Sequence, residues 1–254
     1  MNTLAIGAAD SLYVGGYFTQ FGAAPRGGMA KLAFDGSLDL GWNPGVATEF
    51  PNIDTLSVDG DSVFVGGMFH HAGGAPRENL AKIAAAGSGV ADAAWNPVTD
   101  GWTVYDVIPD HAGSVYVNGP FAHIGGEARN GLARLAAEGS GAPDPTWNPA
   151  LTASPLAVAF DGTYVYATLY DFSVGTTILR FGADCLGVAD ADWNPVFDDS
   201  VYVLADGAGD RLFVGGRFTA AGGAARGGLA AFDAAASSGC SALVDRIFAD
   251  DFDD

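Results

Sequence analysis

A single tripeptide, Trp-Asn-Pro, recurs along this chain of 254 residues and constrains its fold more than any other feature. The four copies are 53, 52 and 46 residues apart, and they begin at Trp42, Trp95, Trp147 and Trp193. A nearly constant spacing of about 50 residues is typical of repeat proteins, in which each copy folds as one supersecondary unit. The chain is therefore expected to be a series of similar units.

Two further strings recur in step with the first. The second string is an aliphatic residue followed by an aromatic residue, valine and a glycine pair (Asn-Gly in one copy). Its copies begin at Leu12, Val63, Val115 and Leu212. The third string reads MAKLAF, LAKIAA, LARLAA and LAAFDA. In all four copies 19 residues separate the aromatic residue from the last apolar residue of the third string, as from Tyr13 to Leu32. A degenerate copy at Tyr164 has Ala167 and Thr168 in place of the glycines, which brings the number of repeats to five.

Each repeat divides into four short apolar segments with turn residues between them. The first segment of the second repeat, Leu56–Val58, leads through an Asp-Gly-Asp turn into the aromatic–Val–Gly–Gly segment, whose alternation is typical of a strand. The third segment is too short to form a helix alone and has glycine-rich flanks, so it is also expected to be a strand. The fourth segment ends in Trp-Asn-Pro. Four short antiparallel strands at this period are typical of β-propeller blades.

The sequence thus predicts an all-β fold, a five-bladed β-propeller of four-stranded antiparallel blades, as a single domain over residues 1–254. The blades are expected at approximately residues 1–45, 46–98, 99–150, 151–196 and 197–250. Cys240 and Phe248 are spaced like Cys185 and Trp193, so the tail is expected to be the outer strand of the fifth blade. Equivalent places on neighbouring blades lie too far apart for a disulfide, and both cysteines are predicted to be unpaired.

The charge of the chain argues against two classes of partner. The sequence has 30 acidic and 11 basic side chains, which gives a net charge of −19. A nucleic-acid-binding surface and a segment attracted to an anionic membrane are both basic, so neither partner is expected. No apolar run approaches the roughly 20 residues of a membrane helix, so membrane insertion is not expected. No cofactor or metal ion is predicted, and the chain is expected to be a monomer.

Four motifs together resemble the delta-60 type of bacterial β-propeller repeat: VGG-x-F, the Gly-Gly-Ala-Pro-Arg loop, LAKL and D-x-x-W-N-P. The glycine pair is also similar to that of kelch repeats. The resemblance covers nearly the whole chain and implies a propeller of the kind found mostly in exported or cell-surface bacterial proteins, usually without an assigned activity. The acidic tail from Asp245 resembles the ends of some exported proteobacterial proteins. An extracellular or cell-surface location is therefore expected.

Candidate site residues are sought in the loops that vary on a regular scaffold. In a four-strand meander, the loops between the second and third strands share one face with the links between blades. That face carries the equivalent arginines Arg26, Arg77, Arg129 and Arg226, and also Trp102, which breaks the repeat. Four guanidinium groups suit an anionic ligand, although their repetition favours an internal hydrogen bond to loop carbonyls or to an Asp. Trp102 is predicted either to contact a ligand or to pack at the start of a strand.

The other repeated features receive structural interpretations. The glycine pairs are expected to be bulges or points of close strand approach, and the tryptophans of Trp-Asn-Pro are expected to pack between blades. His71 and His123 are equivalent residues of neighbouring blades, and a shared metal ion is not expected because ligands must converge on one ion.

The preferred function is a non-catalytic binding or scaffold module that contacts an unknown protein or glycan. The sequence contains no nucleophile motif of the G-x-S-x-G type. The alternative is a carbohydrate-active hydrolase or lyase that uses carboxylates on the same face, such as Asp198 and Asp199. A third option is a chain that dimerises through an unclosed edge.

Overall fold

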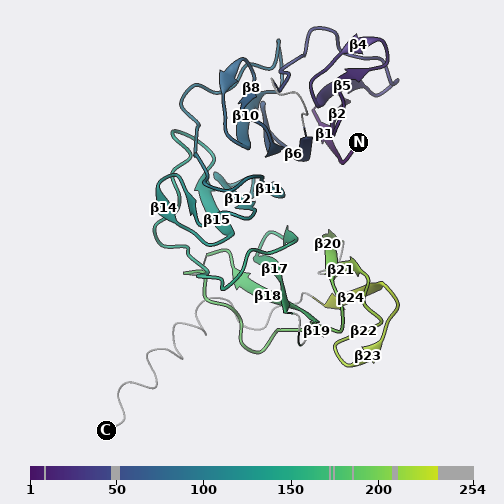
Figure 1. The fold of residues 1–254 in the computed structure, drawn as a ribbon, viewed down its shortest axis with the longest axis vertical. Helices are drawn as coiled ribbons and strands as arrows, with labels where there is room; N and C mark the ends of the chain where they lie inside the picture. The colour runs from purple at the N-terminus through teal and green to yellow at the C-terminus, as the bar shows by residue number, and fades with distance from the viewer. Residues whose placement is uncertain are drawn as a thin grey trace. The chain divides into compact units, whose positions relative to one another are not determined.

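The computed structural model describes residues 1–8, 10–46, 52–171, 173, 175–184, 186–207 and 211–233. The chain divides into two compact units, Met1–Asp144 and Pro145–Asp254. The described residues form an all-β structure, as the sequence predicted, and contain no helix that could cross a membrane (Figure 1). Both cysteines and the tail that was predicted as an outer strand lie outside the described residues.

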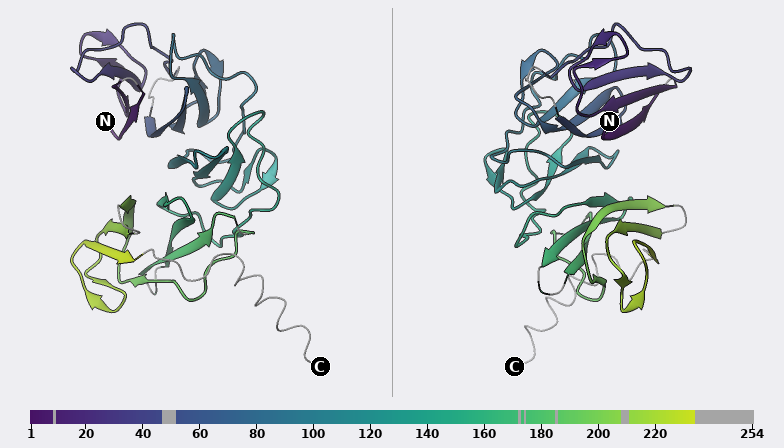
Figure 2. Two further views of the ribbon diagram at one scale, coloured as in Figure 1. Left: turned by 180° about the vertical axis from the view of Figure 1, so that it is seen from behind. Right: turned by 45° about the vertical axis from the view of Figure 1, so that its right-hand side comes forward.

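The first unit contains three repeats, each built on a three-stranded antiparallel sheet (Figure 1 and Figure 2). The sheets are β1 (Thr3–Gly7), β2 (Ser11–Gly15) and β5 (Met29–Ala33); β6 (Asn52–Asp59), β7 (Ser62–Met68) and β10 (Leu80–Ala84); and β11 (Asp106–Pro109), β12 (Ser114–Asn118) and β15 (Leu132–Ala136). A small hairpin separates the second and third strands of each sheet: β3 (Gln20–Phe21) with β4 (Ala24–Pro25), β8 (His71–Ala72) with β9 (Ala75–Pro76), and β13 (His123–Ile124) with β14 (Glu127–Ala128). The third string of the sequence is therefore a strand, as predicted.

The second unit contains the fourth and fifth repeats. Their main strands are β16 (Val158–Phe160), β17 (Tyr164–Asp171) and β18 (Gly175–Gly182), then β20 (Val201–Gly207), β21 (Arg211–Gly216) and β24 (Leu229–Asp233). The short strand β19 (Val196–Phe197) joins β18 to the hairpin of β22 (Ala220–Ala221) and β23 (Ala224–Ala225), so that six strands form one sheet. In the degenerate fourth repeat, β17 and β18 continue as one long hairpin where the other repeats have their small hairpin.

In the first four repeats the predicted fourth strand is not a regular strand, which corrects the expected four-stranded blade for the part of the chain that the structure describes. The segment before Trp-Asn-Pro makes a single isolated bridge in four repeats, at Leu32–Leu38, Ile83–Ala91, Leu135–Pro143 and Phe181–Ala189. In the first repeat the carboxylate of Asp39 then accepts the backbone N–H groups of Gly41 at 2.9 Å and Trp42 at 3.2 Å. Because an aspartate side chain captures these groups, the chain turns instead of extending the ladder.

The glycine pair marks a close approach of two strands, as the sequence predicted. A Cβ atom on Gly67 would lie 2.2 Å from the carbonyl oxygen of Asn52. The facing strand β6 shifts its register at this point, between Ile53 and Thr55. The irregular register lets β6 start at Asn52, well before the predicted start at Leu56.

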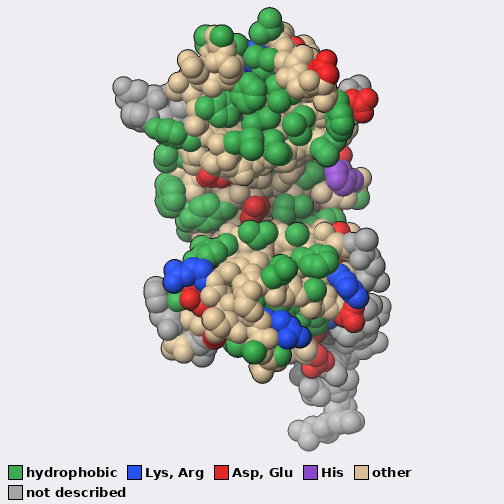
Figure 3. Space-filling model, turned by 90° about the vertical axis from the view of Figure 1, so that its right-hand side faces the viewer, with side chains coloured by type: hydrophobic (Ala, Val, Ile, Leu, Met, Phe, Trp, Pro, Cys, Tyr) green, Lys and Arg blue, Asp and Glu red, His purple; other side chains and the backbone are tan. Residues whose placement is uncertain are grey.

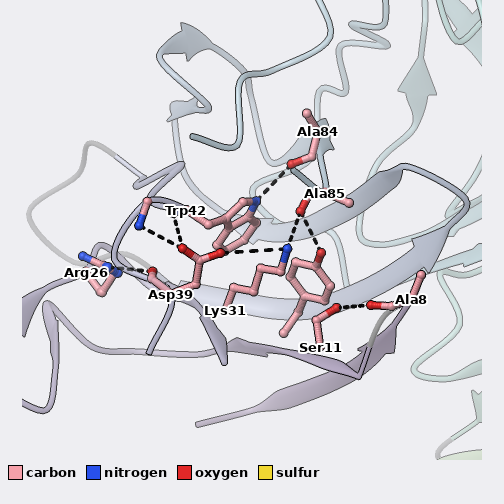
Figure 4. Close-up of polar contacts among 10 residues, drawn as sticks. Ala8, Ser11, Arg26, Lys31, Asp39, Trp42, Ala84 and Ala85 are labelled. Carbon is pink, nitrogen blue, oxygen red and sulfur yellow. Dashed lines mark hydrogen bonds and ion pairs between the residues drawn. The ribbon is translucent and has the colours of Figure 1, made fainter. Parts of the chain in front are cut away.

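In the first unit, the tryptophan of Trp-Asn-Pro fills the space between its own repeat and the next one. Trp42 and Trp95 are both fully buried. Trp42 donates its indole N–H to the carbonyl oxygen of Ala84 at 3.0 Å, and its ring meets Tyr13 edge-on with 5.1 Å between centroids (Figure 4). Trp95 makes the equivalent bond to Ala136 at 2.9 Å. Packing between repeats, the predicted role, is confirmed for Trp42 and Trp95.

Replacing Trp95 by alanine is expected to lower the free energy of unfolding by about 3–5 kcal/mol, because the change empties a fully buried site. Trp102→Ala is the matched control, since that side chain is 62% exposed, and it should cost less than about 0.5 kcal/mol. Urea titrations followed by circular dichroism measure both values. Similar costs for the two variants would contradict the packing role.

Candidate functional site

The link that enters a repeat lies against the small hairpin of the same repeat. In the third repeat, the carboxylate of Asp100 accepts the backbone N–H groups of Ala122 at 2.8 Å and His123 at 2.9 Å. In the fifth repeat, Asp198 accepts the backbone N–H of Thr219 at 2.8 Å in the same way. The links and the loops between second and third strands therefore share one face in these repeats, as the meander predicted.

Three of the four candidate arginines are buried structural groups. The exposed fractions are 4%, 6% and 5% for Arg26, Arg77 and Arg129. The guanidinium of Arg129 donates to the carbonyl oxygens of Ala128 at 2.7 Å and Asp144 at 2.8 Å. Arg26 makes the equivalent pair of bonds, one of them to Asp39 (Figure 4). The structure thus contains the internal hydrogen bond that was one of the two interpretations, and a ligand would have to displace it.

The fourth arginine, Arg226, is exposed and donates to the carbonyl oxygen of Ala225 at 2.9 Å. It belongs to the second unit, whereas Trp102 belongs to the first. The two histidines considered as metal ligands have different surroundings. His71 is exposed, whereas the ring of His123 pairs with the carboxylate of Asp100 at 2.8 Å. In the described part of the chain, no three His, Cys, Asp or Glu side chains are placed to hold a metal ion.

Trp102 differs from the tryptophans of the repeat in being open to solvent. Its side chain is 62% exposed, and it packs edge-on against Tyr105 with 6.1 Å between the ring centroids and 84° between the ring planes. Tyr105 thus contacts the Trp102 ring, while most of the ring surface stays accessible to solvent. Contact with a ligand remains a prediction for this residue.

A side chain that sequence reasoning missed holds the link that carries Trp102. Asn79 donates its side-chain N–H to the carbonyl oxygen of Gly101 at 2.9 Å, while its own Oδ1 accepts the backbone N–H of Phe69 at 3.1 Å. Asn79 has a φ of +63°, in the left-handed region, where the equivalent residues of other repeats are glycines. Those glycines are Gly28, Gly131 and Gly228. This departure from glycine in one repeat was a signal from which the residue could have been found.

A chain of hydrogen-bonded polar side chains connects the three repeats of the first unit. Asn2 donates to Asn52 Oδ1 at 3.0 Å, and Asn52 donates to Asp54 Oδ1 at 2.7 Å. The hydroxyl of Thr103 donates to Asp54 Oδ2 at 2.9 Å. The second and third repeats contribute the residues that we call the Trp102 patch: Trp102, Tyr105, Thr103, Asp54 and Asn52.

Burial controls the acidity of this patch. Burial raises the pKa of the Asp54 carboxyl above its ordinary value, although the hydrogen bonds from Thr103 and Asn52 act in the opposite direction. Burial, and then the negative charge of Asp54, raise the pKa of the Tyr105 hydroxyl. Asp54 is therefore a weaker acid than an exposed aspartate, and Tyr105 is a weaker acid than an exposed tyrosine.

The carboxylates that cap the hairpins show the opposite shift. Hydrogen bonds from the backbone and side chain of His123 lower the pKa of Asp100. Hydrogen bonds from Thr219 and Ala220 lower the pKa of Asp198, one of the two residues considered for glycoside chemistry. A general acid requires a raised pKa, so neither cap is suited to that role.

Comparison with known proteins supports the fold. The model of a family described as "Domain of unknown function (DUF5122) beta-propeller" matches residues 10–41, which run from the residue before β2 to the residue before the first Trp-Asn-Pro. No curated protein matches the chain. The family match and the repeated all-β sheets together support a β-propeller domain.

Arg129→Lys is expected to lower the free energy of unfolding by about 1–3 kcal/mol, because the two bonds come from the two separate terminal nitrogens of the planar guanidinium, and an ammonium group has only one nitrogen. Arg226→Lys is the control, since the exposed side chain should tolerate the change within about 0.5 kcal/mol. Thermal and urea unfolding measure both variants. Equal stability of the two would show that the buried bonds are unimportant.

Asp54→Asn is expected to change the stability of the protein in a pH-dependent way. Because folding raises the pKa of Asp54, the cost of its charge is absent below the unfolded pKa and appears as the pH rises through the folded pKa. The neutral side chain removes that cost, and at every pH it also replaces one oxygen acceptor by an NH2 group. Relative to the wild type, the variant should therefore be a few tenths of a kcal/mol more favourable at pH 7 than at about pH 3, since solvent screens a half-buried carboxylate.

Asp100→Asn provides the control of opposite sign. The pKa of Asp100 is lowered by folding, so this carboxylate stabilises the protein above its unfolded pKa, and the effect is lost as the pH falls through the folded pKa. Urea titrations at pH 7 and at about pH 3 compare the variants with the wild type. The burial cost would be contradicted if the stability difference between Asp54→Asn and the wild type did not shift in favour of the variant between about pH 3 and pH 7.

Proposed function

We propose that this chain is a non-catalytic binding module, a five-bladed β-propeller of the delta-60 type, and that the Trp102 patch binds a neutral glycan. The main support is the exposed ring of Trp102, which lies on the link into the third repeat, a segment held by several contacts. An exposed aromatic side chain that is already positioned loses little conformational freedom when it binds, so its contact area contributes to affinity.

Three contacts hold the ring and its link before any ligand arrives. Asn79 fixes the carbonyl of Gly101 from the neighbouring repeat, and Thr99 accepts the backbone N–H of Gly101 at 2.8 Å. Tyr105 packs against the ring itself. The loop conformation therefore depends on contacts from both sides of the link, as expected of a preformed recognition surface.

The chemistry of the patch suits the hydroxyl-rich, partly apolar surface of a sugar. The Trp102 ring offers an apolar face, and the half-buried Asp54 and Asn52 of the same patch offer a carboxylate and an amide group. Thr103 is 1% exposed, and its hydroxyl supports Asp54. The patch contains no cationic side chain, which disfavours an anionic ligand. Apolar contact with a few placed polar groups is the usual composition of a ligand site.

Binding is favoured over catalysis by the state of the one carboxylate in the patch. Both oxygens of Asp54 already accept hydrogen bonds, from Asn52 and Thr103. Glycoside hydrolysis requires a second carboxylate facing the first across the scissile bond. We also propose that the module lies outside the cell or on its surface, because its repeats resemble those of exported proteins.

Trp102→Ala is expected to weaken glycan binding at least about tenfold, because removal of a central aromatic contact costs about 1.4 kcal/mol or more. Isothermal titration calorimetry with neutral cello-, xylo- and manno-oligosaccharides measures the affinity. Leu40→Ala is the matched control: this exposed side chain lies in the first repeat, and the second repeat already has Ala93 at the same place. It should leave the affinity unchanged.

Two outcomes would contradict the proposal. Failure of the wild type to bind any of the oligosaccharides would remove the glycan as ligand, and equal affinity of Trp102→Ala would remove the patch. Release of reducing sugars during the titration, abolished in Asp54→Asn, would favour the carbohydrate-active alternative over a binding module.

A further inference from the structure

The position after the glycine pair (Asn-Gly in the third repeat) carries a different residue in every regular repeat. These residues are Tyr17, Met68, Pro120 and Arg217. A position that varies on a regular scaffold is a candidate for ligand contact. Exposed apolar side chains are common on this protein, and a group of them covers part of the upper half of Figure 3. Exposure alone therefore does not single out Met68, which is 41% exposed, but its surroundings do.

Two hydrogen bonds anchor the link that bears Trp102 on either side of β7. The sheet of the second repeat has the strand order β10–β7–β6. On one side, Asn79, the residue before β10, donates to the carbonyl oxygen of Gly101 at 2.9 Å. On the other side, Asp54 of β6 accepts the hydroxyl of Thr103 at 2.9 Å. Because Trp102 lies between the two anchored residues, its backbone crosses β7.

Met68 is the last residue of β7 and lies at this crossing. The carbonyl oxygen of Gly67 accepts the backbone N–H of Val104 at 3.2 Å, which holds the link against the residue before Met68. Both neighbours of Met68 are also bonded to Asn79. Gly67 donates its backbone N–H to the Asn79 carbonyl at 3.1 Å, and Phe69 donates its own to Oδ1 at 3.1 Å. The backbone of Met68 is therefore fixed, while its side chain stays accessible to solvent.

On the β6 side, Met68 borders the polar part of the Trp102 patch. Asn52 is its direct partner in the β6–β7 ladder. Residues directly opposite each other in an antiparallel pair point to the same side of the sheet, with their Cα atoms about 5 Å apart. Adjacent chains are separated by about 4.8 Å, so the path from Asn52 over Met68 to the link of Trp102 is about 10 Å long. Such a path is longer than a single sugar ring.

We propose that Met68 is a second apolar contact for the ligand of the Trp102 patch, and that this ligand is a neutral oligosaccharide rather than a single sugar. The inference rests on the proposed glycan binding. The ligand extends from the Trp102 ring across Met68 to the amide of Asn52, so that successive sugar rings meet an apolar, an apolar and a polar group. An unbranched thioether side chain adapts to a ring of irregular outline, which suits Met68 to the middle of this path.

Titrations with neutral cello-, xylo- and manno-saccharides of increasing length test the proposal, by calorimetry or, for millimolar affinities, by NMR. In the series that binds, the affinity of the wild type should rise at least about tenfold from the monosaccharide to the trisaccharide. Met68→Ala should weaken trisaccharide binding at least about fivefold, and it should change monosaccharide binding less than about twofold. Trp102→Ala should weaken both.

Two further variants separate a contact from a structural role. Met68→Leu restores an apolar side chain of similar volume and should recover most of the affinity that Met68→Ala loses. Val90→Ala is the matched control: this side chain of the same repeat is 60% exposed, and the third repeat has Ala142 at the equivalent place beside its isolated bridge. It should bind the trisaccharide like the wild type. Circular dichroism melts establish that each variant keeps the unfolding midpoint of the wild type.

The results distinguish failure of this contact from failure of the glycan site. If Met68→Ala bound the trisaccharide like the wild type while Trp102→Ala lost it, the second contact would be overturned and the glycan site would stand. An equal loss for monosaccharide and trisaccharide in Met68→Ala would place both side chains at one sugar and overturn the inferred length. A wild type that binds no saccharide of any length would overturn the glycan site itself, and the second contact with it.

Discussion

The hydrogen bond from a buried tryptophan to the main chain of the following repeat supports the rest of this structure. A single repeat cannot bury the hydrophobic face of its sheet without a neighbouring repeat. Trp42 solves this problem by filling the space beside its own Tyr13 and donating to Ala84 of the next sheet. Trp95 does the same one repeat later. Because the indole N–H would otherwise be buried without an acceptor, the distance between neighbouring sheets is set by this bond.

The candidate site depends on that spacing. The link bearing Trp102 leaves Trp95 and crosses to the third sheet, where Asn79 and Asp54 of the second repeat reach it through Gly101 and Thr103. Bonds of this length exist only if the two sheets keep their separation. Burial raises the pKa of Asp54, so the charged carboxylate lowers the stability of the folded protein at neutral pH. Other contacts of the scaffold offset this loss.

Sequence periodicity was sufficient to predict the strands that recur in each repeat, but it could not predict the contacts made between repeats. The second and third strands follow from local alternation, and the glycine pair follows from the crowding at Gly67. The fourth strand was wrong because a side-chain acceptor, Asp39, captures the backbone N–H groups that a ladder would need. Asn79 differs from the glycines of the other repeats and could have been noticed, but the bonds from Asn79 to Gly101 and from Thr103 to Asp54 join neighbouring repeats, and a local pattern does not reveal such partners.

The six-stranded sheet of the second unit has a consequence for how the protein opens. In the first unit the sheets of neighbouring repeats are separate, whereas in the second β19 pairs with both β18 and β22 and carries one main-chain ladder from the fourth repeat into the fifth. Separate sheets that contact each other through side chains and a few isolated main-chain bonds, such as the one from Val104 N–H to the Gly67 carbonyl at 3.2 Å, approximate a linear array with nearest-neighbour terms. A shared ladder makes the last two repeats a single cooperative foldon, whose amide protons should exchange together by one common opening event.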